Sequence, residues 1–219
     1  WDSQSGKEIK TLTGYNSMVY GIAFSPDGKT IASGGDGGTI KLWDSQSGTE
    51  IKTLAGHNIR VNCVTFSPNG KIIASVSLSR SGNIRLWDSQ SGDEIKRLTR
   101  HDADVHRVAF SPDGKIIASA SRTDIKLWDS QTGDEIKTLR VPYGFLSVAF
   151  SPDGKIIASG GVDTTVRLWD VSALTEDTDF INSVDTVALK ANVERSAAIK
   201  DALASGDWQT VLGLDPENS

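Results

Sequence analysis

Short runs of hydrophobic residues alternate with short polar links along the first 170 residues of the chain. One stretch, residues 110–139 (FSPDGKIIASASRTDIKLWDSQTGDEIKTL), represents the pattern, because close copies of it make up most of the other residues. Each copy holds four apolar runs of strand length, bounded by Gly, Pro, Asp and Ser. The pattern predicts a four-stranded antiparallel meander as the repeated unit.

The links between the runs have the residue types of tight turns. Ser-Pro-Asp-Gly or Ser-Pro-Asn-Gly joins the first two runs, and Asp-Ser-Gln-Ser-Gly or Asp-Ser-Gln-Thr-Gly joins the last two. Proline presets φ, Asp or Asn binds the neighbouring backbone, and Gly accepts a positive φ. The apolar residues Val105, Val108 and Phe110 cannot share one face of a regular strand, so we expect a β-bulge near His106 and Arg107.

A Trp-Asp pair ends the third run of each copy, at a period of 41 to 44 residues. The pairs are Trp1-Asp2, Trp43-Asp44, Trp87-Asp88, Trp128-Asp129 and Trp169-Asp170. Period, strand number and Trp-Asp pair resemble the WD-repeat β-propeller family, in its bacterial type with near-identical repeats. The resemblance implies an all-β propeller of four blades over residues 1–171. Its repeats span about 14–54, 56–98, 100–139 and 141–170, with an outer strand at 7–12.

The sequence leaves open three arrangements of the propeller. Residues 7–12 complete the last blade of a closed four-blade ring, the repeats form an open arc of a partial propeller cut from a longer protein, or two chains complete one ring as a homodimer. We favour the partial propeller, because the sequence starts inside a repeat. An arc leaves two apolar blade faces exposed.

The pattern changes after Val171. Residues 172–219 hold nine acidic and three basic residues, a net charge of −6. The apolar spacing predicts an acidic helical segment with helices over 178–191 and 194–205, and Asp207 is a candidate cap for a short third helix. The last part resembles a tetratricopeptide-type helical repeat. An amphipathic tail docked on the last blade is the alternative, and both stay open.

Composition excludes several classes of function. The chain has a net charge of −5, which leaves about +1 for the repeats and no basic excess for nucleic acid. No stretch has the length and apolar character of a membrane span. Cys63 is the only cysteine, which excludes an intrachain disulfide and favours a cytoplasmic protein. Residues 34–38 (GGDGG) lie between two strands, unlike a phosphate loop, so we expect no cofactor.

The family resemblance also implies a buried hydrogen-bonded set in each repeat, made of a His, a Ser, an Asp and the Trp. We expect no repeat to hold the whole set, because Tyr15 and Val141 replace two of the histidines and the Asp is absent, displaced or in a shortened turn. The members are Ser33, Asp36 and Trp43; His57, Ser75 and Trp87, with Ser81 at the Asp position; His101, Ser119 and Trp128, with Arg122 and Asp124 nearby; and Ser159, Asp163 and Trp169. Because these residues recur beside a Trp in repeat after repeat, we interpret them as structural and not as a catalytic triad. The histidines, with His106 the third, are too scattered to form a metal site.

The copies differ most where the chain enters the first run, which contains YNSMVY, HNIRVN, HDADVH or VPYGFLS. In the family these positions, with the turn before the third strand, open on the face that most often receives partner proteins. Aromatic, Met and Arg side chains are frequent interface anchors. The corresponding residues are Met18, Tyr20, Arg60, Asn62, Asp104, His106, Phe145 and Ser147, with Asp36, Arg80, Arg122 and Val162 from the turns.

These residues lead to the hypothesis of a non-catalytic scaffold that binds partner proteins or peptides on its loop face. Sequence drift at exposed positions is the alternative explanation of the differences between copies. A second functional hypothesis is a regulatory or sensor module of a larger signalling enzyme, a kinase or nucleotide hydrolase, whose catalytic domain lies outside this chain.

Overall fold

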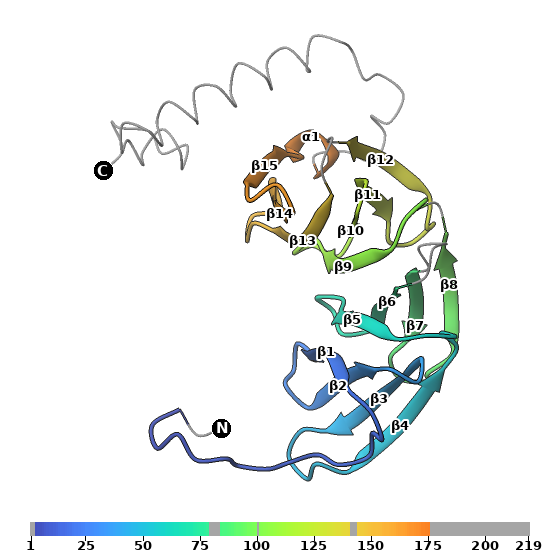
Figure 1. Ribbon diagram of the computed structural model, residues 1–219, viewed down its shortest axis with the longest axis vertical. Helices are drawn as coiled ribbons and strands as arrows, with labels where there is room; N and C mark the ends of the chain where they lie inside the picture. The colour runs from blue at the N-terminus through green and yellow to red at the C-terminus, as the bar shows by residue number, and fades with distance from the viewer. Residues whose placement is uncertain (1–2, 79–83, 100, 141–143, 176–219) are drawn as a thin grey trace. The chain divides into compact units, whose positions relative to one another are not determined.

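The repeats form four antiparallel sheets in the computed structural model, which describes residues 3–78, 84–99, 101–140 and 144–175 (Figure 1). The first sheet consists of β1 (Val19–Phe24), β2 (Thr30–Gly35), β3 (Thr39–Asp44) and β4 (Glu50–Ala55). The second consists of β5 (Val61–Phe66), β6 (Ile72–Ser77), β7 (Ile84–Asp88) and β8 (Glu94–Leu98). The third consists of β9 (Val105–Phe110), β10 (Ile116–Ser121), β11 (Asp124–Asp129) and β12 (Glu135–Arg140). The predicted meanders are confirmed, and we call these sheets blades 1 to 3.

Blade 4 has three strands in the described part of the chain: β13 (Phe145–Phe150), β14 (Ile156–Gly161) and β15 (Val166–Asp170). A single helical turn, α1 (Ser172–Thr175), follows it. The chain divides into two compact units, Trp1–Trp169 and Asp170–Ser219. The helices predicted over 178–191 and 194–205, and the tetratricopeptide-type segment, lie outside the described residues. The domain limits at 171 and 172 stay a prediction.

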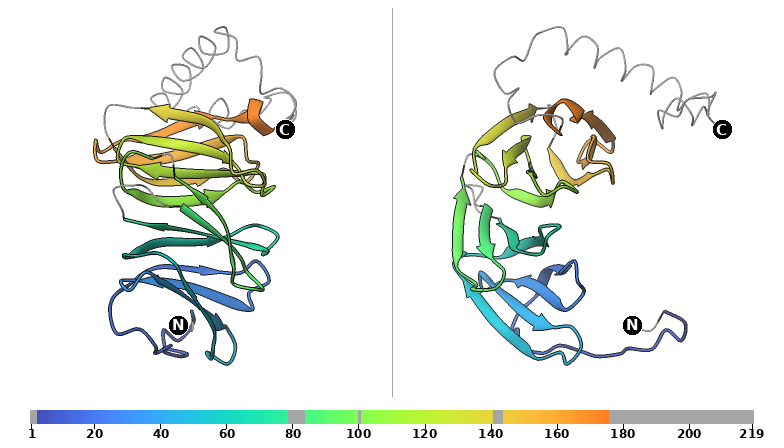
Figure 2. Two further views of the ribbon diagram at one scale, coloured as in Figure 1. Left: turned by 90° about the vertical axis from the view of Figure 1, so that its right-hand side faces the viewer. Right: turned by 180° about the vertical axis from the view of Figure 1, so that it is seen from behind.

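Within the first unit the blades stack face against face. The strands β1, β5, β9 and β13 lie next to one another on the inner side, and β4, β8 and β12 lie on the outer side (Figures 1 and 2). Ile40 and Leu42 of blade 1 pack with Val61, Val64 and Trp87 of blade 2 in one buried cluster. An equivalent cluster joins blades 2 and 3. Blades 1 and 4 do not close a ring, which confirms the partial propeller.

Each inner strand carries a β-bulge near its first residue. Arg107 and Val105 pair with the consecutive residues Ala120 and Ser121, so His106 is the extra residue, as the sequence predicts. The equivalent extra residues in the other blades are Tyr20, Asn62 and Leu146. At this residue the bulge interrupts the regular alternation of side chains along the strand.

Residues 7–12 do not form the predicted outer strand. They form no β-ladder in the described structure and lie against blade 1, where Lys10 Nζ donates hydrogen bonds to the carbonyl oxygens of Ser47 at 2.6 Å and Gln46 at 3.3 Å. β15, the third strand of blade 4, has an unpaired edge in the described structure, but residues 7–12 do not pair with it. They therefore do not close the ring within this unit.

Candidate functional site

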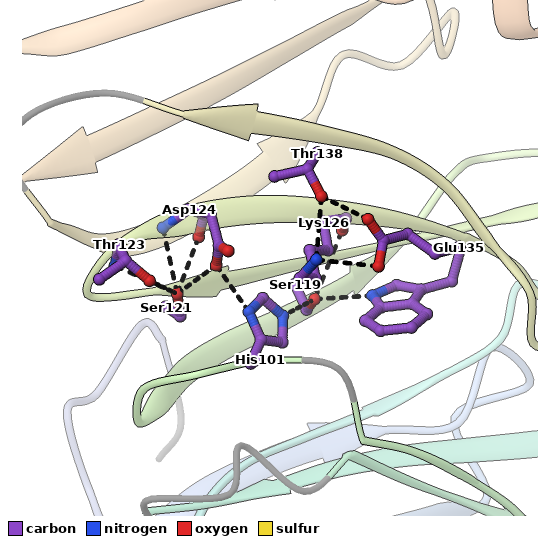
Figure 3. Close-up of polar contacts among 9 residues, drawn as sticks. His101, Ser119, Ser121, Thr123, Asp124, Lys126, Glu135 and Thr138 are labelled. Atoms are coloured by element: carbon purple, nitrogen blue, oxygen red, sulfur yellow. Dashed lines mark hydrogen bonds and ion pairs between the residues drawn. The ribbon is translucent and has the colours of Figure 1, made fainter.

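A complete buried polar network lies in blade 3 (Figure 3). The Nε1 of Trp128 donates a hydrogen bond to Ser119 Oγ at 2.8 Å, and Ser119 Oγ lies 2.6 Å from His101 Nε2. The other ring nitrogen of His101 lies 2.7 Å from Asp124 Oδ1. The expectation that no repeat holds the whole set is therefore wrong for the third repeat. Its turn is shorter, and Asp124 at the start of β11 reaches the histidine directly.

Partners and burial explain what this network does. The carboxylate of Asp124 accepts from His101 Nδ1–H, which makes His101 Nε2 the acceptor for the hydroxyl of Ser119. Burial raises the pKa of Asp124, but hydrogen bonds from His101 and Ser121 outweigh it and bring the pKa below its ordinary value. Ser119, His101 and Asp124 have triad-like contacts, yet all three are buried and Ser119 exposes no surface to a substrate. The network fastens the loop before β9 to the sheet.

The other blades hold parts of the same network. In blade 2, His57 Nε2 lies 2.7 Å from Ser75 Oγ, to which Trp87 also donates. Burial, followed by the charge of Arg85, lowers the pKa of His57 to about 4, so its ring is neutral at pH 7. In blade 1 the hydroxyl of Tyr15 takes the place of the imidazole, 3.0 Å from Ser33 Oγ. Ser81, the candidate Asp position of blade 2, lies outside the described residues.

Blade 4 departs furthest from the pattern. Trp169 Nε1 donates to Ser159 Oγ at 2.8 Å, and Phe145 contacts the Trp169 ring edge-on at 5.9 Å between centroids. Asp163 binds Arg167 and Thr165 and has a pKa lowered to about 2, first by the hydrogen bond from Arg167.

The Asp of each Trp-Asp pair forms the turn that follows it. Asp44 Oδ1 accepts hydrogen bonds from the backbone of Ser47 at 2.6 Å and of Gln46 at 3.1 Å. Asp88 and Asp129 bind the backbone of their own turns in the same way, and Asp170 binds Ser172. These carboxylates are therefore turn-forming groups.

The residues that differ between copies meet at the bulges of the inner strands. The guanidinium carbon of Arg60 lies 4.3 Å from the ring centroid of Tyr20, across blades 1 and 2. The amide of Asn62 donates to the carbonyl oxygen of His106 at 2.9 Å, across blades 2 and 3. We call this surface the bulge rim, and it consists of Met18, Tyr20, Arg60, Asn62, Asp104, His106, Arg107, Arg122 and Leu146.

The bulge rim differs from the predicted set in blade 4. Phe145 is fully buried, so the expectation that it faces a partner is wrong. It pairs with Gly161 at the position of Val105 in blade 3, and Leu146, which is 43% exposed, is the bulged residue. Ser147 is exposed and belongs to the regular ladder, opposite Gly160. Phe145 precedes Phe150 by five residues, as Val105 precedes Phe110. This spacing would have identified Phe145 as the buried position.

Cations outnumber anions at the centre of the bulge rim. Arg122 Nε lies 3.5 Å from His106 Nε2, and Arg107 donates to the carbonyl oxygen of Asn62 at 3.2 Å. Burial, and then the charge of Arg122, lower the pKa of His106, while Asp104 opposes this shift. Of the other turn residues, the backbone of Asp36 donates to Met18 O, Val162 is exposed, and Arg80 lies outside the described residues.

An open hollow of about 360 Å³ lies at the opposite ends of the inner strands. Its lining comes from the Phe-Ser-Pro segments of all four blades, such as Phe110 and Pro112. Because these residues repeat almost unchanged, they distinguish no blade from another. In the described residues, no group of three or more His, Cys, Asp or Glu side chains is placed to hold a metal ion. No helix there has the length and apolar character to cross a membrane.

Comparison with known proteins agrees with the geometry. A family model described as the IFT122 first beta-propeller matches residues 35–214, and one described as WD domain, G-beta repeat matches residues 6–44. The chain therefore belongs to the WD-repeat β-propeller family. The nuclear distribution protein PAC1 of Mycosarcoma maydis is 58% identical over 33 residues, which are 15% of this chain and 7% of that protein. WD-repeat propellers generally mediate protein–protein interactions and are typically non-catalytic.

Proposed function

We propose that this chain is a non-catalytic interaction module that binds a protein or peptide segment on its bulge rim. The single observation that carries the proposal is the contrast between the repeated framework of the blades and the bulge rim. Turns, Trp-Asp pairs and packed faces repeat almost unchanged, whereas the side chains that differ gather on the four bulges of one rim. Loops and bulges on a rigid scaffold are frequent binding sites.

The contacts within the bulge rim argue against drift at unconstrained positions. Tyr20 stacks with Arg60 and Asn62 binds the backbone at His106, so the variable side chains bridge neighbouring blades. Met18 nevertheless stays 68% exposed, which leaves an apolar side chain available to a ligand. The surface is therefore organised in advance and partly apolar, as interface centres are.

The chemistry of the bulge rim defines the ligand we expect. Arg60, Arg107 and Arg122 act electrostatically on His106 together with a single carboxylate, that of Asp104, so the charge around His106 is mainly positive and an acidic segment is favoured. Met18, Tyr20 and Leu146 favour an apolar residue in the same segment. A cytoplasmic location belongs to the proposal and is supported by Cys63, whose thiol is free and buried. If the chain is instead the regulatory module of a larger signalling enzyme, the catalytic domain of that enzyme would dock on the same surface.

A peptide-display selection on the immobilised chain tests the proposal. Selected peptides should combine acidic and apolar residues, and Tyr20→Ala with Arg60→Ala should weaken their binding at least about tenfold. The matched control is Ile95→Ala with Lys29→Ala, which removes an exposed apolar residue and a cation away from the rim. Equal weakening by both double variants, or selected peptides without acidic residues, would contradict the proposed site.

A further inference from the structure

Residues 7–12 occupy on blade 1 the place that an outer strand occupies on the next blade. Lys52 of β4 donates to the carbonyl oxygens of Gln90 and Ser91 in blade 2, and Lys96 of β8 does the same in blade 3. Lys10 makes the matching pair of hydrogen bonds on blade 1. The sequence EIKTL at 8–12 is also that of β4 at 50–54. Residues 7–12 therefore lie as the outer strand of a preceding blade.

This segment carries a carboxylate prepared for a cross-strand ion pair. In the complete blades a cation of the third strand binds a Glu of the outer strand: Lys41 binds Glu50 at 2.6 Å and Lys126 binds Glu135 at 2.8 Å. Glu8 has the equivalent position, and Thr11 donates to it as Thr53 donates to Glu50. No cation in the described residues pairs with Glu8.

Blade 4 has the reciprocal vacancy on its β15 edge. Among the described residues no strand pairs with that edge. Arg167 has the position of Lys41 and Lys126 but binds Asp163 within its own strand and turn. Val166 and Leu168 are 76% and 43% exposed, whereas the equivalent residues of blade 3 are fully buried.

The faces of blades 1 and 4 are complementary in the same register. A Cβ added at Gly34 of blade 1 would lie 2.5 Å from Val61 Cγ1, because Val61 of blade 2 packs on that glycine. The equivalent Gly160 of blade 4 has nothing within 4 Å of such a Cβ. Val19, which corresponds to Val61, is 48% exposed on blade 1. A valine at the position of Val19 fits the space above Gly160.

We propose that two copies of this chain associate head to tail by strand addition. Residues 7–12 of one copy pair with β15 of the other as its fourth strand, and blade 1 of the first packs on blade 4 of the second. The register of β11 with β12 places Thr11 opposite Arg167 and Lys10 opposite Leu168. Glu8 then binds Arg167 as Glu135 binds Lys126.

A second copy is the occupant that the observations favour. The strand, its carboxylate and the valine of one copy match the edge, the arginine and the glycine of the other, so one sequence supplies both halves of the interface. Such an interface is heterologous, and it closes with two copies or continues into longer assemblies. The added strand also removes an exposed sheet edge.

A charge exchange at this pair tests the proposal with the full 219-residue chain. The mass in solution is measured up to about 100 μM by light scattering and sedimentation. The wild-type chain should associate, and Glu8→Arg or Arg167→Glu alone should weaken association at least about tenfold. An equimolar mixture of the two variants should associate again, because one junction then joins Arg at position 8 to Glu at position 167 and the other is wild type.

Two further variants separate this interface from general effects of charge and folding. Lys115→Glu makes the same charge change as Arg167→Glu on an exposed surface and should associate like the wild-type chain. Gly160→Phe should block association and leave the thermal stability of the dilute, unassociated chain unchanged, because the space above Gly160 is open in the single chain. A monomeric wild-type chain, a mixture that stays monomeric, or a Gly160→Phe chain that still associates would overturn the proposal. Closure of blade 4 by the chain's own residues 7–12 would give the first of these results.

Discussion

Removal of the Ser119 hydroxyl tests the physical role of the buried network. Ser119→Ala leaves Trp128 Nε1–H and His101 Nε2 without their shared partner at sites that are almost completely buried. Each unsatisfied buried group costs about 1–3 kcal/mol, so the free energy of unfolding should fall by about 2–6 kcal/mol. The small decrease in side-chain volume on removal of one oxygen contributes little to this fall in the free energy of unfolding.

Ser159→Ala in blade 4 is the matched control. There the hydroxyl accepts from Trp169 Nε1, and the indole is only half-buried, so water can replace the bond at a cost of about 1 kcal/mol. Urea unfolding of both variants, followed by far-UV circular dichroism, gives the two free energies if the slopes agree. Losses that are equal, or a Ser119→Ala loss below about 1 kcal/mol, would refute the view that the network fastens the blade.

Three other substitutions or conditions test individual parts of the fold. The folded-state pKa of His57 is lowered to about 4 from its ordinary 6.5. The contribution of neutral His57 to the free energy of unfolding should therefore be fully present above pH 6.5 and fall by about 3 kcal/mol as the pH drops toward 4. His57→Asn should remove this pH dependence, measured by unfolding at a series of pH values. Phe145→Ala should cost about 3–5 kcal/mol of stability in urea unfolding, since the ring is fully buried, and a wild-type unfolding curve would contradict its placement. Gly34→Ala should cost about 1–3 kcal/mol because its Cβ meets Val61, whereas Gly160→Ala should be neutral in thermal melts of the chain at a dilution where it does not associate; equal effects would contradict the blade register.

The repeated features of the fold could be predicted from the sequence because each depends on local chemistry. Pro, Asp and Gly define the turns wherever they recur, as in residues 111–114, and the spacing of Val105, Val108 and Phe110 requires a bulge. Blade 4 has no outer strand among the described residues, which agrees with the three apolar runs counted in the fourth repeat. The prediction of a strand at 7–12 was wrong because a strand forms only beside a neighbouring strand. The local sequence does not determine whether such a neighbour is present.

The candidate site was only partly predictable. Asp124 was named beside His101, Ser119 and Trp128 but was not expected to complete their network, because the shortened turn does not match the family spacing. Phe145 was misplaced because the segment 141–147 shares no motif with the other copies, and only its distance from Phe150 defines its register. The contacts of Tyr20 with Arg60 and of Asn62 with His106 join different blades, and their partners depend on how the sheets stack.

Site-specific photo-crosslinking tests the central claim of a binding rim most directly. A photoreactive residue at Met18, on the bulge rim, is compared with the same residue at Ile51, on the outer strand β4; the two native side chains are 68% and 53% exposed. With a peptide selected on the chain, crosslinking should be strong at position 18 and near background at position 51. Equal crosslinking at both positions, or capture only at position 51, would contradict a partner-binding surface on the bulge rim.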